Sequence, residues 1–231
     1  MKDKYMIENQ HYRYERKFIL PSILKDHLEL IIYKNQGRFR QVYSERLVNN
    51  IYFDTCNYDF YYQNIEGDAN RNKIRLRWYG NIFGSIKSTI EVKVKKGLVG
   101  TKLNYSLPII NLSRTNTVQE FKNTILENIA DNLITQEILM TNPVLMNSYV
   151  RKYYLSLDKK YRITVDINLK SYNLTHNKLF AHTQNFKSQL TILELKYNNN
   201  DNDAANLITS LFPFRLTKFS KYIAGMQSIT L

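Results

Sequence analysis

The segment KIRLRWYG, residues 73–80, carries a cation at every second position: Lys73, Arg75 and Arg77. The residues between these cations are apolar. Alternate side chains of a β-strand share one face, so one face of this strand would be basic and the other apolar. An arginine can hold two phosphate oxygens at once, and a lysine acts as a compact positive charge. The segment therefore favours binding of a phosphate-rich anion if its basic face points into a cavity.

The same alternation of charged and apolar positions recurs around residues 13–17, 91–95, 162–166 and 194–196. For any one strand, a charged face in contact with water is the ordinary explanation. Taken together, the apolar faces can support helices from outside, which leaves the charged faces to line the interior of a closed or nearly closed barrel. Two like charges about 4 Å apart repel by roughly 4 kcal/mol at an effective dielectric constant near 20. Such an interior would need a bound polyanion, water or interleaved carboxylates.

The elements that must position these side chains follow from local patterns. We expect strands at 12–21, 47–55, 72–80, 88–96, 101–108, 148–157, 160–168 and 191–197. We expect helices at 22–35 behind a Ser22 cap, at 56–68, at 114–140 and at 203–211, and residues 216–225 close the fold. The expected fold class is α+β: a closed antiparallel β-barrel of about eight strands with flanking helices, formed by residues 1–231 as one domain.

Composition limits the class of partner. The chain has 231 residues with 33 Lys and Arg against 20 Asp and Glu, a formal net charge of +13 and a pI near 9.6. This excess favours an anionic partner such as nucleic acid, a nucleotide, polyphosphate or an acidic membrane surface. The single Cys56 excludes an internal disulfide and fits a reducing compartment. No segment has the roughly 18 consecutive apolar residues of a membrane-spanning helix, and the first ten residues do not resemble a signal peptide, so we expect a cytoplasmic protein.

Other phosphate, metal and nucleic-acid motifs do not match. The segment GLVGTK (97–102) has two residues between its glycines where a P-loop has four, so we interpret it as a hairpin turn. The four histidines, at 11, 27, 176 and 182, form no metal-binding spacing. No nucleic-acid-binding motif accompanies the basic charge, and Trp78 and Tyr79 are interpreted as packing residues rather than base-stacking ones. Lys218 and Lys221 lie three residues apart, on one side of the chain if it is helical there, and alone would form an exposed basic patch.

Eight segments, in this order, resemble the VTC domain, a polyphosphate polymerase module of the CYTH, or triphosphate tunnel metalloenzyme, superfamily. They are YERKF (14–18), NIYFDT (50–55), KIRLRWYG (73–80), TIEVKVKKG (89–97) with Lys102 after it, SYVRKYY (148–154), YRITVD (161–166), LELKY (193–197) and TKFSKY (217–222). The match runs over nearly the whole chain, and RLRWYG together with FSKY points to the VTC branch. The resemblance implies a closed antiparallel barrel with a charged tunnel, in agreement with the alternation of faces.

The resemblance also implies the site residues. The implied catalytic set, which would hold the reacting phosphates, is Lys17, Arg75, Arg77, Lys93, Arg151, Arg162 and Lys196. Further substrate-binding positions would be Lys102, Tyr149, Lys218, Ser220 and Lys221. A divalent cation, Mn²⁺ or Mg²⁺, would be held by Glu194, with Glu15, Glu91 and Asp166 as weaker candidates. The YERK segment lacks the Glu-x-Glu-x-Lys run of many other CYTH members, which argues against thiamine-triphosphatase or adenylate-cyclase activity.

By resemblance, the partners are ATP and inorganic polyphosphate: ATP would donate its γ-phosphate to the end of the polymer, and ADP would leave. Nucleic acid is not an expected partner. The chain itself shows no membrane span, and association with a membrane partner stays open. The residues leave three alternatives: a tunnel hydrolase that cleaves triphosphate or nucleoside triphosphates, a non-catalytic polyphosphate or nucleotide sensor, and, least favoured, a nucleic-acid binder.

Overall fold

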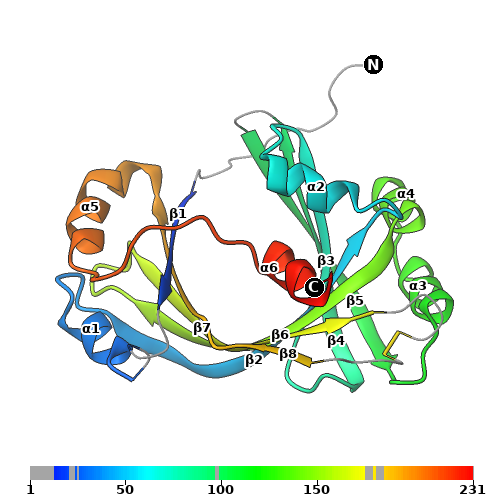
Figure 1. Ribbon diagram of the computed structural model, residues 1–231, viewed down its shortest axis with the longest axis horizontal. Helices are drawn as coiled ribbons and strands as arrows, with labels where there is room; N and C mark the ends of the chain where they lie inside the picture. Colours follow the sequence, from blue (N-terminus) through cyan, green and yellow to red (C-terminus); the bar gives the residue numbers. More distant parts are fainter. Residues whose placement is uncertain are drawn as a thin grey trace. The chain divides into compact units, whose positions relative to one another are not determined.

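An antiparallel sheet forms the framework of the fold (Figure 1). Its strands are β1 (Arg13–Leu20), β2 (Arg40–Asp54), β3 (Arg71–Tyr79), β4 (Gly84–Lys96), β5 (Val99–Leu112), β6 (Asn142–Leu155), β7 (Arg162–Asn173), β8 (Asn185–Ser188) and β9 (Thr191–Asn198). Their order is β1-β9-β7-β6-β2-β3-β4-β5, and the short β8 pairs with β7. The expected antiparallel sheet of about eight strands is confirmed. Within the part of the chain that the structure describes, no pairing joins β1 to β5, so closure of the barrel stays a prediction.

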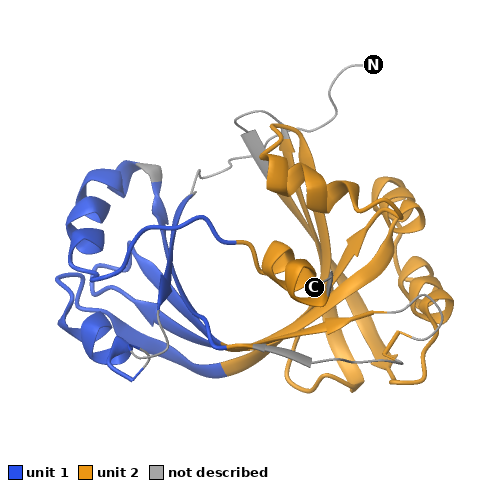
Figure 2. Ribbon diagram, in the orientation of Figure 1, with its two compact units in different colours: residues 1–45, 151–167, 189–219 blue, residues 46–150, 168–188, 220–231 orange. Residues whose placement is uncertain are grey.

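The chain divides into two compact units in the computed structural model (Figure 2). Unit 1 contains residues 1–45, 151–167 and 189–219, and unit 2 contains residues 46–150, 168–188 and 220–231. The structure describes residues 13–20, 24, 26–96, 99–174, 179–180 and 185–230. Strands β2, β6 and β7 contribute residues to both units. The expectation of a single domain stays a prediction.

In unit 2, the apolar face of β3 is buried under helices. Its side chains Ile74, Leu76 and Trp78 have no exposed surface. They share one hydrophobic cluster with side chains of α3 (Val118–Leu126) and α4 (Asn132–Met140). Burial of apolar surface stabilises such a layer by roughly 25 cal/mol per Å². For this unit, the prediction that the apolar strand faces support the helices is therefore confirmed, and the cationic face points the other way.

The expected helical region at 114–140 is confirmed, and the chain forms two helices there rather than one continuous helix. Helix α3 begins with a capping box, in which Thr117 and Glu120 each bond the other's backbone N–H. Helix α4 begins after Asp131, whose side chain accepts from the backbone N–H groups of Leu133 and Ile134. The apolar periodicity continues through the break, so the pattern did not reveal this second cap.

Unit 1 is built on β1, β9 and the first part of β7. Strand β9 pairs with β1 on one side and with β7 on the other. Their apolar side chains form a cluster with those of α1 (Leu28–Lys34) and α5 (Asn202–Ser210), and the short η2 (Asn199–Asp201) precedes α5. Helix α1 begins later than expected, because residues 26 and 27 form a turn and His27 is its N-cap. Ser22, the expected cap, lies outside the described residues.

Helices α2 (Asp59–Glu66) and α6 (Lys221–Thr230) complete unit 2. Helix α6 approaches β6 closely at Gly225, where a Cβ atom would lie 2.5 Å from Leu145 Cδ2. Helices α2 and α5 confirm the expected helices at 56–68 and 203–211. In the described residues, no helix is both long enough and apolar enough to cross a membrane.

Several strands are longer than expected: β4 begins at Gly84 rather than 88, β5 ends at Leu112 rather than 108, β6 begins at Asn142 rather than 148, and β7 ends at Asn173 rather than 168. Strand β2 begins at Arg40 rather than at residue 47. Its first residues were not predicted as strand because they are exposed and show no apolar alternation. Strand β4 pairs with β5 up to Lys96 and Val99, which fits the predicted turn at 97–100. Residues 97 and 98 lie outside the described residues.

Candidate functional site

The charged face of unit 2 gathers side chains from several strands. In the sheet, Arg75 is paired with Tyr52 on β2 and with Glu91 on β4. Lys102 of β5 joins the same face, because its partner is Lys93 of β4. Side chains of directly paired residues lie on the same face of a sheet. We call this surface the basic cluster, and its members are Tyr52, Lys73, Arg75, Arg77, Glu91, Lys102, Tyr149, Ser220 and Lys221.

Glu91 lies at the centre of the basic cluster and is 8% exposed. Arg75 Nε and Nη2 lie 2.7 and 2.5 Å from Glu91 Oε2. Lys102 Nζ and Arg77 Nη1 lie 3.1 and 3.5 Å from Glu91 Oε1. Burial alone would raise the pKa of Glu91, but these three cations lower it to about 2. The carboxylate is therefore ionised at neutral pH and holds the cations in place.

Neutral side chains from β2 and β6 position Arg77 as well. Its Nε donates to Asn50 Oδ1 over 2.8 Å, and its Nη2 donates to the Tyr149 hydroxyl over 3.4 Å. Asn50 Nδ2 in turn donates to Asn147 Oδ1 over 2.8 Å. These bonds orient the guanidinium group before a ligand arrives, which reduces the entropy lost on binding.

The chain at the start of α6 supplies further members of the basic cluster. Lys73 Nζ lies 3.4 Å from Ser220 Oγ and 5.0 Å from the centre of the Tyr52 ring. Lys221 Nζ lies 4.9 Å from the centre of the Tyr149 ring. Contacts between an ammonium group and an aromatic face are attractive. The structure thus brings Ser220 and Lys221, which are distant in sequence from KIRLRWYG, to the basic face of that strand.

An anchor made of Asp54 and Tyr222 holds α6 in place. The Tyr222 hydroxyl donates to the Asp54 carboxylate, and both side chains are buried. Asp54 also accepts from the backbone N–H groups of Thr55, Phe60 and Tyr61, at 2.8, 2.9 and 2.9 Å. Burial raises the pKa of Asp54, and the hydrogen bonds from Tyr222 and these N–H groups oppose that rise. This anchor was not predicted from the sequence.

The basic cluster holds more positive than negative charge. Its cations are Lys73, Arg75, Arg77, Lys102 and Lys221, whereas Glu91 is the one carboxylate among its members. The excess acts on Tyr52: burial would raise the pKa of its hydroxyl, yet four of these cations, Lys73 foremost, lower it to about 7. A buried phenol that ionises so readily indicates a strongly positive local potential. The basic cluster is therefore suited to hold an anion with several charges.

Unit 1 holds a second charged group, which we call the carboxylate cluster: Glu15, Lys17, Thr164, Glu194 and Lys196. Lys17 Nζ lies 2.8 Å from Glu15 Oε1 and 3.6 Å from Glu194 Oε1. Lys196 Nζ lies 3.2 Å from Glu194 Oε2 and 3.7 Å from Glu15 Oε2. Thr164 Oγ1 donates to Glu194 Oε2 over 3.4 Å. Two carboxylates thus share two lysines on the neighbouring strands β1 and β9.

The carboxylate cluster supplies part of the donor set that a divalent cation needs. Mg²⁺ in phosphoryl-transfer sites is usually held by one or two carboxylates together with phosphate oxygens and water. Glu194 and Glu15 supply that number of carboxylates, whereas Glu91 is engaged by three cations. Asp166 accepts from Arg151 Nε and Nη2 at 2.6 and 2.7 Å. Among the described residues, no three or more His, Cys, Asp or Glu group closely enough to hold a metal by themselves, so a ligand would have to complete the set.

The remaining predicted positions lie beside these two clusters. Lys93 is exposed on the same face of β4 as the basic cluster. Arg162 is exposed on β7, and its partner in the sheet is Lys196. Lys218 is exposed in a segment whose backbone bonds to that of Lys17, since the Thr217 N–H donates to the Lys17 carbonyl over 2.8 Å.

Comparison with known proteins identifies the family and the fold of this chain. The model of the VTC domain family matches residues 1–230. A candidate adenylate cyclase of Vibrio parahaemolyticus is 9% identical and has a TM-score of 0.53, with 96% of this chain and 100% of that chain covered. A candidate adenylyl cyclase of Hippeastrum, described as having a dominant triphosphatase activity, is 14% identical and has a TM-score of 0.54, with 94% and 96% covered. No curated protein matches. The two structures share the fold, and because the family model spans residues 1–230, this protein belongs to the VTC domain family.

Proposed function

We propose that this protein is a metal-dependent polyphosphate polymerase, which transfers the γ-phosphate of ATP onto inorganic polyphosphate and releases ADP. The observation that carries the proposal is the charge of the basic cluster, in which five cations accompany one carboxylate. A chain of phosphates would neutralise this excess. Membership of the VTC domain family supports a phosphate-rich substrate. The proposal includes a cytoplasmic location and no role for nucleic acid.

The basic cluster would bind the reacting phosphates. Phosphoryl transfer requires that donor and acceptor lie in line and that the charge on the transferring group is neutralised, with little covalent participation of the protein. Arg75 and Arg77 would contact phosphate oxygens as forks, and Lys73 and Lys102 would act as point charges. Tyr149 would donate a hydrogen bond. Because Arg77 is already held by Asn50 and Tyr149, little reorganisation of its guanidinium group would accompany binding.

The carboxylate cluster would hold the metal. Mn²⁺ or Mg²⁺, bound by Glu194 and Glu15, would neutralise charge on phosphate oxygens. Lys17 and Lys196 orient the two carboxylates and could turn to phosphate oxygens when a ligand arrives. Further phosphate contacts would come from Lys93, Arg151, Arg162, Lys218, Ser220 and Lys221.

A hydrolase is the second candidate. The same groups would bind a triphosphate for hydrolysis, with water in place of the polymer end as the nucleophile. The triphosphatase activity described for the Hippeastrum protein favours this candidate. A non-catalytic sensor would bind the same ligands without turnover.

The test is to incubate the purified protein with γ-labelled ATP and Mn²⁺, with and without a short polyphosphate primer, and to resolve the products. A ladder of labelled polyphosphate with a matching amount of ADP is the result that the proposal predicts. Label that appears only in free phosphate would identify a hydrolase instead. Tight polyphosphate binding without any turnover would identify a sensor.

A further inference from the structure

The charged face of β3 continues past Arg77 to Tyr79. Side chains alternate along the strand, so Tyr79 lies on the same face as Arg75 and Arg77. On β4, the partner of Arg77 is Thr89, and Lys87 is the next residue on that face. Two residues along a strand advance about 6.7 Å. Tyr79 is therefore within reach of a ligand whose phosphates contact Arg77.

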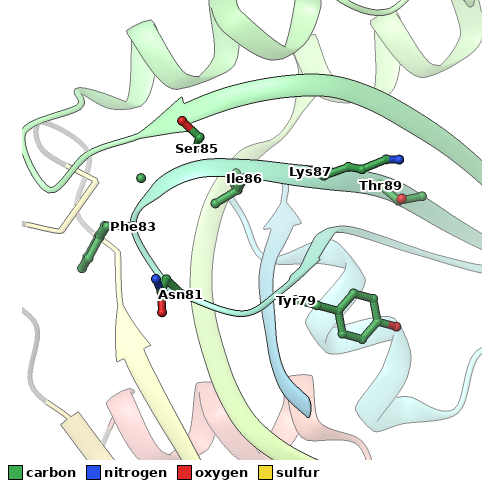
Figure 3. Close-up of a pocket in the computed structure, with 8 residues that line it drawn as sticks. Tyr79, Asn81, Phe83, Ser85, Ile86, Lys87 and Thr89 are labelled. Atoms are coloured by element: carbon green, nitrogen blue, oxygen red, sulfur yellow. The ribbon is translucent and has the colours of Figure 1, made fainter. Parts of the chain in front are cut away.

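A pocket of about 580 Å³ opens at this point, in the hairpin between β3 and β4 (Figure 3). Its lining includes Tyr79, Asn81, Phe83, Ser85, Lys87 and Thr89. Figure 3 shows Tyr79 and Lys87 extending from the two arms of the hairpin toward the same side. The volume lies within the range of roughly 300–1,000 Å³ that is usual for small-molecule sites.

The lining of this pocket differs from the basic cluster. It has one cation, Lys87, and no carboxylate, and Tyr79 is its exposed aromatic residue. The ring of Phe83, the other aromatic residue of the lining, packs against Phe180 with 5.0 Å between ring centres. Tyr79 is 50% exposed, and Arg46 Cζ lies 5.9 Å from the centre of its ring. The prediction that Trp78 is a packing residue is confirmed by its complete burial, whereas Tyr79 leaves half of its surface exposed. A half-exposed ring is suited to stack on a flat aromatic group rather than to bind phosphate.

Hydrogen bonds fix the shape of this hairpin. The Gly80 N–H donates to the Leu47 carbonyl over 3.0 Å, and Asn49 Nδ2 donates to the Gly80 carbonyl over 2.9 Å. Trp78 Nε1 donates to the Asn81 carbonyl over 2.9 Å. Gly80 has a φ of 90°, a conformation that favours glycine. The pocket is thus formed before a ligand arrives, as is usual for small-molecule sites.

The face continues in the opposite direction with two further cations. Beyond Lys73, the next residues on that face are Arg71 on β3 and its partner Lys95 on β4. We propose that the pocket at Tyr79 binds the base and ribose of a nucleotide whose phosphates lie on the basic cluster, with Tyr79 stacking on the base. This inference rests on the proposed function, and it assigns the nucleoside end of the substrate to a specific pocket.

The test compares the binding of ATP with that of inorganic tripolyphosphate, both by isothermal titration calorimetry. Tyr79→Ala should raise the Kd for ATP roughly tenfold, because one stacked base contributes about that much, and should leave the Kd for tripolyphosphate unchanged. Tyr79→Phe keeps an aromatic ring and should bind both ligands as the unmodified protein does. Tyr62→Ala removes an exposed tyrosine of α2 outside the pocket and should change neither Kd.

Each other outcome overturns a defined part of this account. An unchanged Kd for ATP in Tyr79→Ala would overturn the nucleoside site while the proposed function stands. An equal loss of affinity for ATP and tripolyphosphate would also overturn it, because Tyr79 would then act through the phosphate site. If the unmodified protein binds neither ligand, the proposed function itself fails.

Discussion

Replacing Glu91 with Gln should destabilise the free protein and, at the same time, strengthen its binding of tripolyphosphate. Gln keeps the size of the side chain and removes its charge. The pKa of Glu91 is about 2 against an ordinary value of 4.5. At 1.36 kcal/mol per pKa unit, this difference corresponds to about 3 kcal/mol in the free energy of unfolding. The side chain is 10% exposed, and loss of one partner from a buried ion pair costs a similar 3–5 kcal/mol.

The effect on binding has the opposite sign. In the free protein, the Glu91 carboxylate accepts hydrogen bonds from Arg75 and Lys102 that a bound phosphate would otherwise accept. Without that carboxylate, a bound tripolyphosphate meets these donors free of competition and also relieves the repulsion among the cations. We expect the Kd for tripolyphosphate to fall by about tenfold, which corresponds to about 1.4 kcal/mol.

Urea unfolding at several pH values, followed by calorimetric titration with tripolyphosphate, measures both effects. The contribution of Glu91 to stability is complete above about pH 4.5 and is lost as the pH falls toward 2, so the difference between the two proteins should shrink in that range. Glu66→Gln, at an exposed position on α2, should change neither stability nor affinity. Equal stability at pH 7, or weaker binding by a folded Glu91→Gln protein, would refute the role of Glu91 as the counter-charge.

Three further predictions concern the anchor, the phenol and the metal. Tyr222→Phe removes the hydrogen bond to Asp54 and should lower the free energy of unfolding, measured in urea, by about 1.5–3 kcal/mol, as is usual for a bond to a charged group. It should also weaken tripolyphosphate binding, because α6 is then held less firmly. The control Tyr62→Phe keeps the anchor and should change neither the free energy of unfolding nor the affinity for tripolyphosphate. The ultraviolet difference spectrum of the unmodified protein should show an ionisation step of one tyrosine near pH 7. This step should be absent from the spectrum of Tyr52→Phe, and tripolyphosphate should shift it to higher pH. A spectrum of the unmodified protein without this step would contradict the positive potential assigned to the basic cluster. Glu194→Gln should abolish Mn²⁺-dependent turnover of labelled ATP and leave metal-free tripolyphosphate binding intact, and unchanged turnover would exclude Glu194 as the metal ligand.

The division of strand faces could be predicted from sequence because it depends on local alternation. In β3, Ile74 and Leu76 share one face and Arg75 and Arg77 share the other, and the period of two residues fixes this division without any tertiary information. The structure then shows that the face of Ile74 and Leu76 is the buried one. The same reasoning could have placed Tyr52 on the charged face, because alternation along NIYFDT sets it opposite Ile51 and Phe53.

Features that depend on distant segments could not be predicted in this way. The anchor joins Asp54 to Tyr222, which are 168 residues apart, and no local pattern links them. The break between α3 and α4 was hidden because apolar residues continue across it, and its N-cap, Asp131, was seen only in the structure. The half-exposed state of Tyr79 depends on the shape of the hairpin between β3 and β4. Hydrogen bonds to Leu47 and from Asn49, which lie on the preceding strand β2, fix that shape.

The measurement that tests the central claim most directly is a crystal structure of the protein with tripolyphosphate and Mn²⁺. The account predicts phosphate groups within hydrogen-bond distance of Arg75, Arg77 and Lys102, and Mn²⁺ bound by Glu194 together with phosphate oxygens. Tripolyphosphate bound elsewhere, with these three side chains still engaged only by Glu91, would contradict the assignment of the basic cluster as the phosphate site.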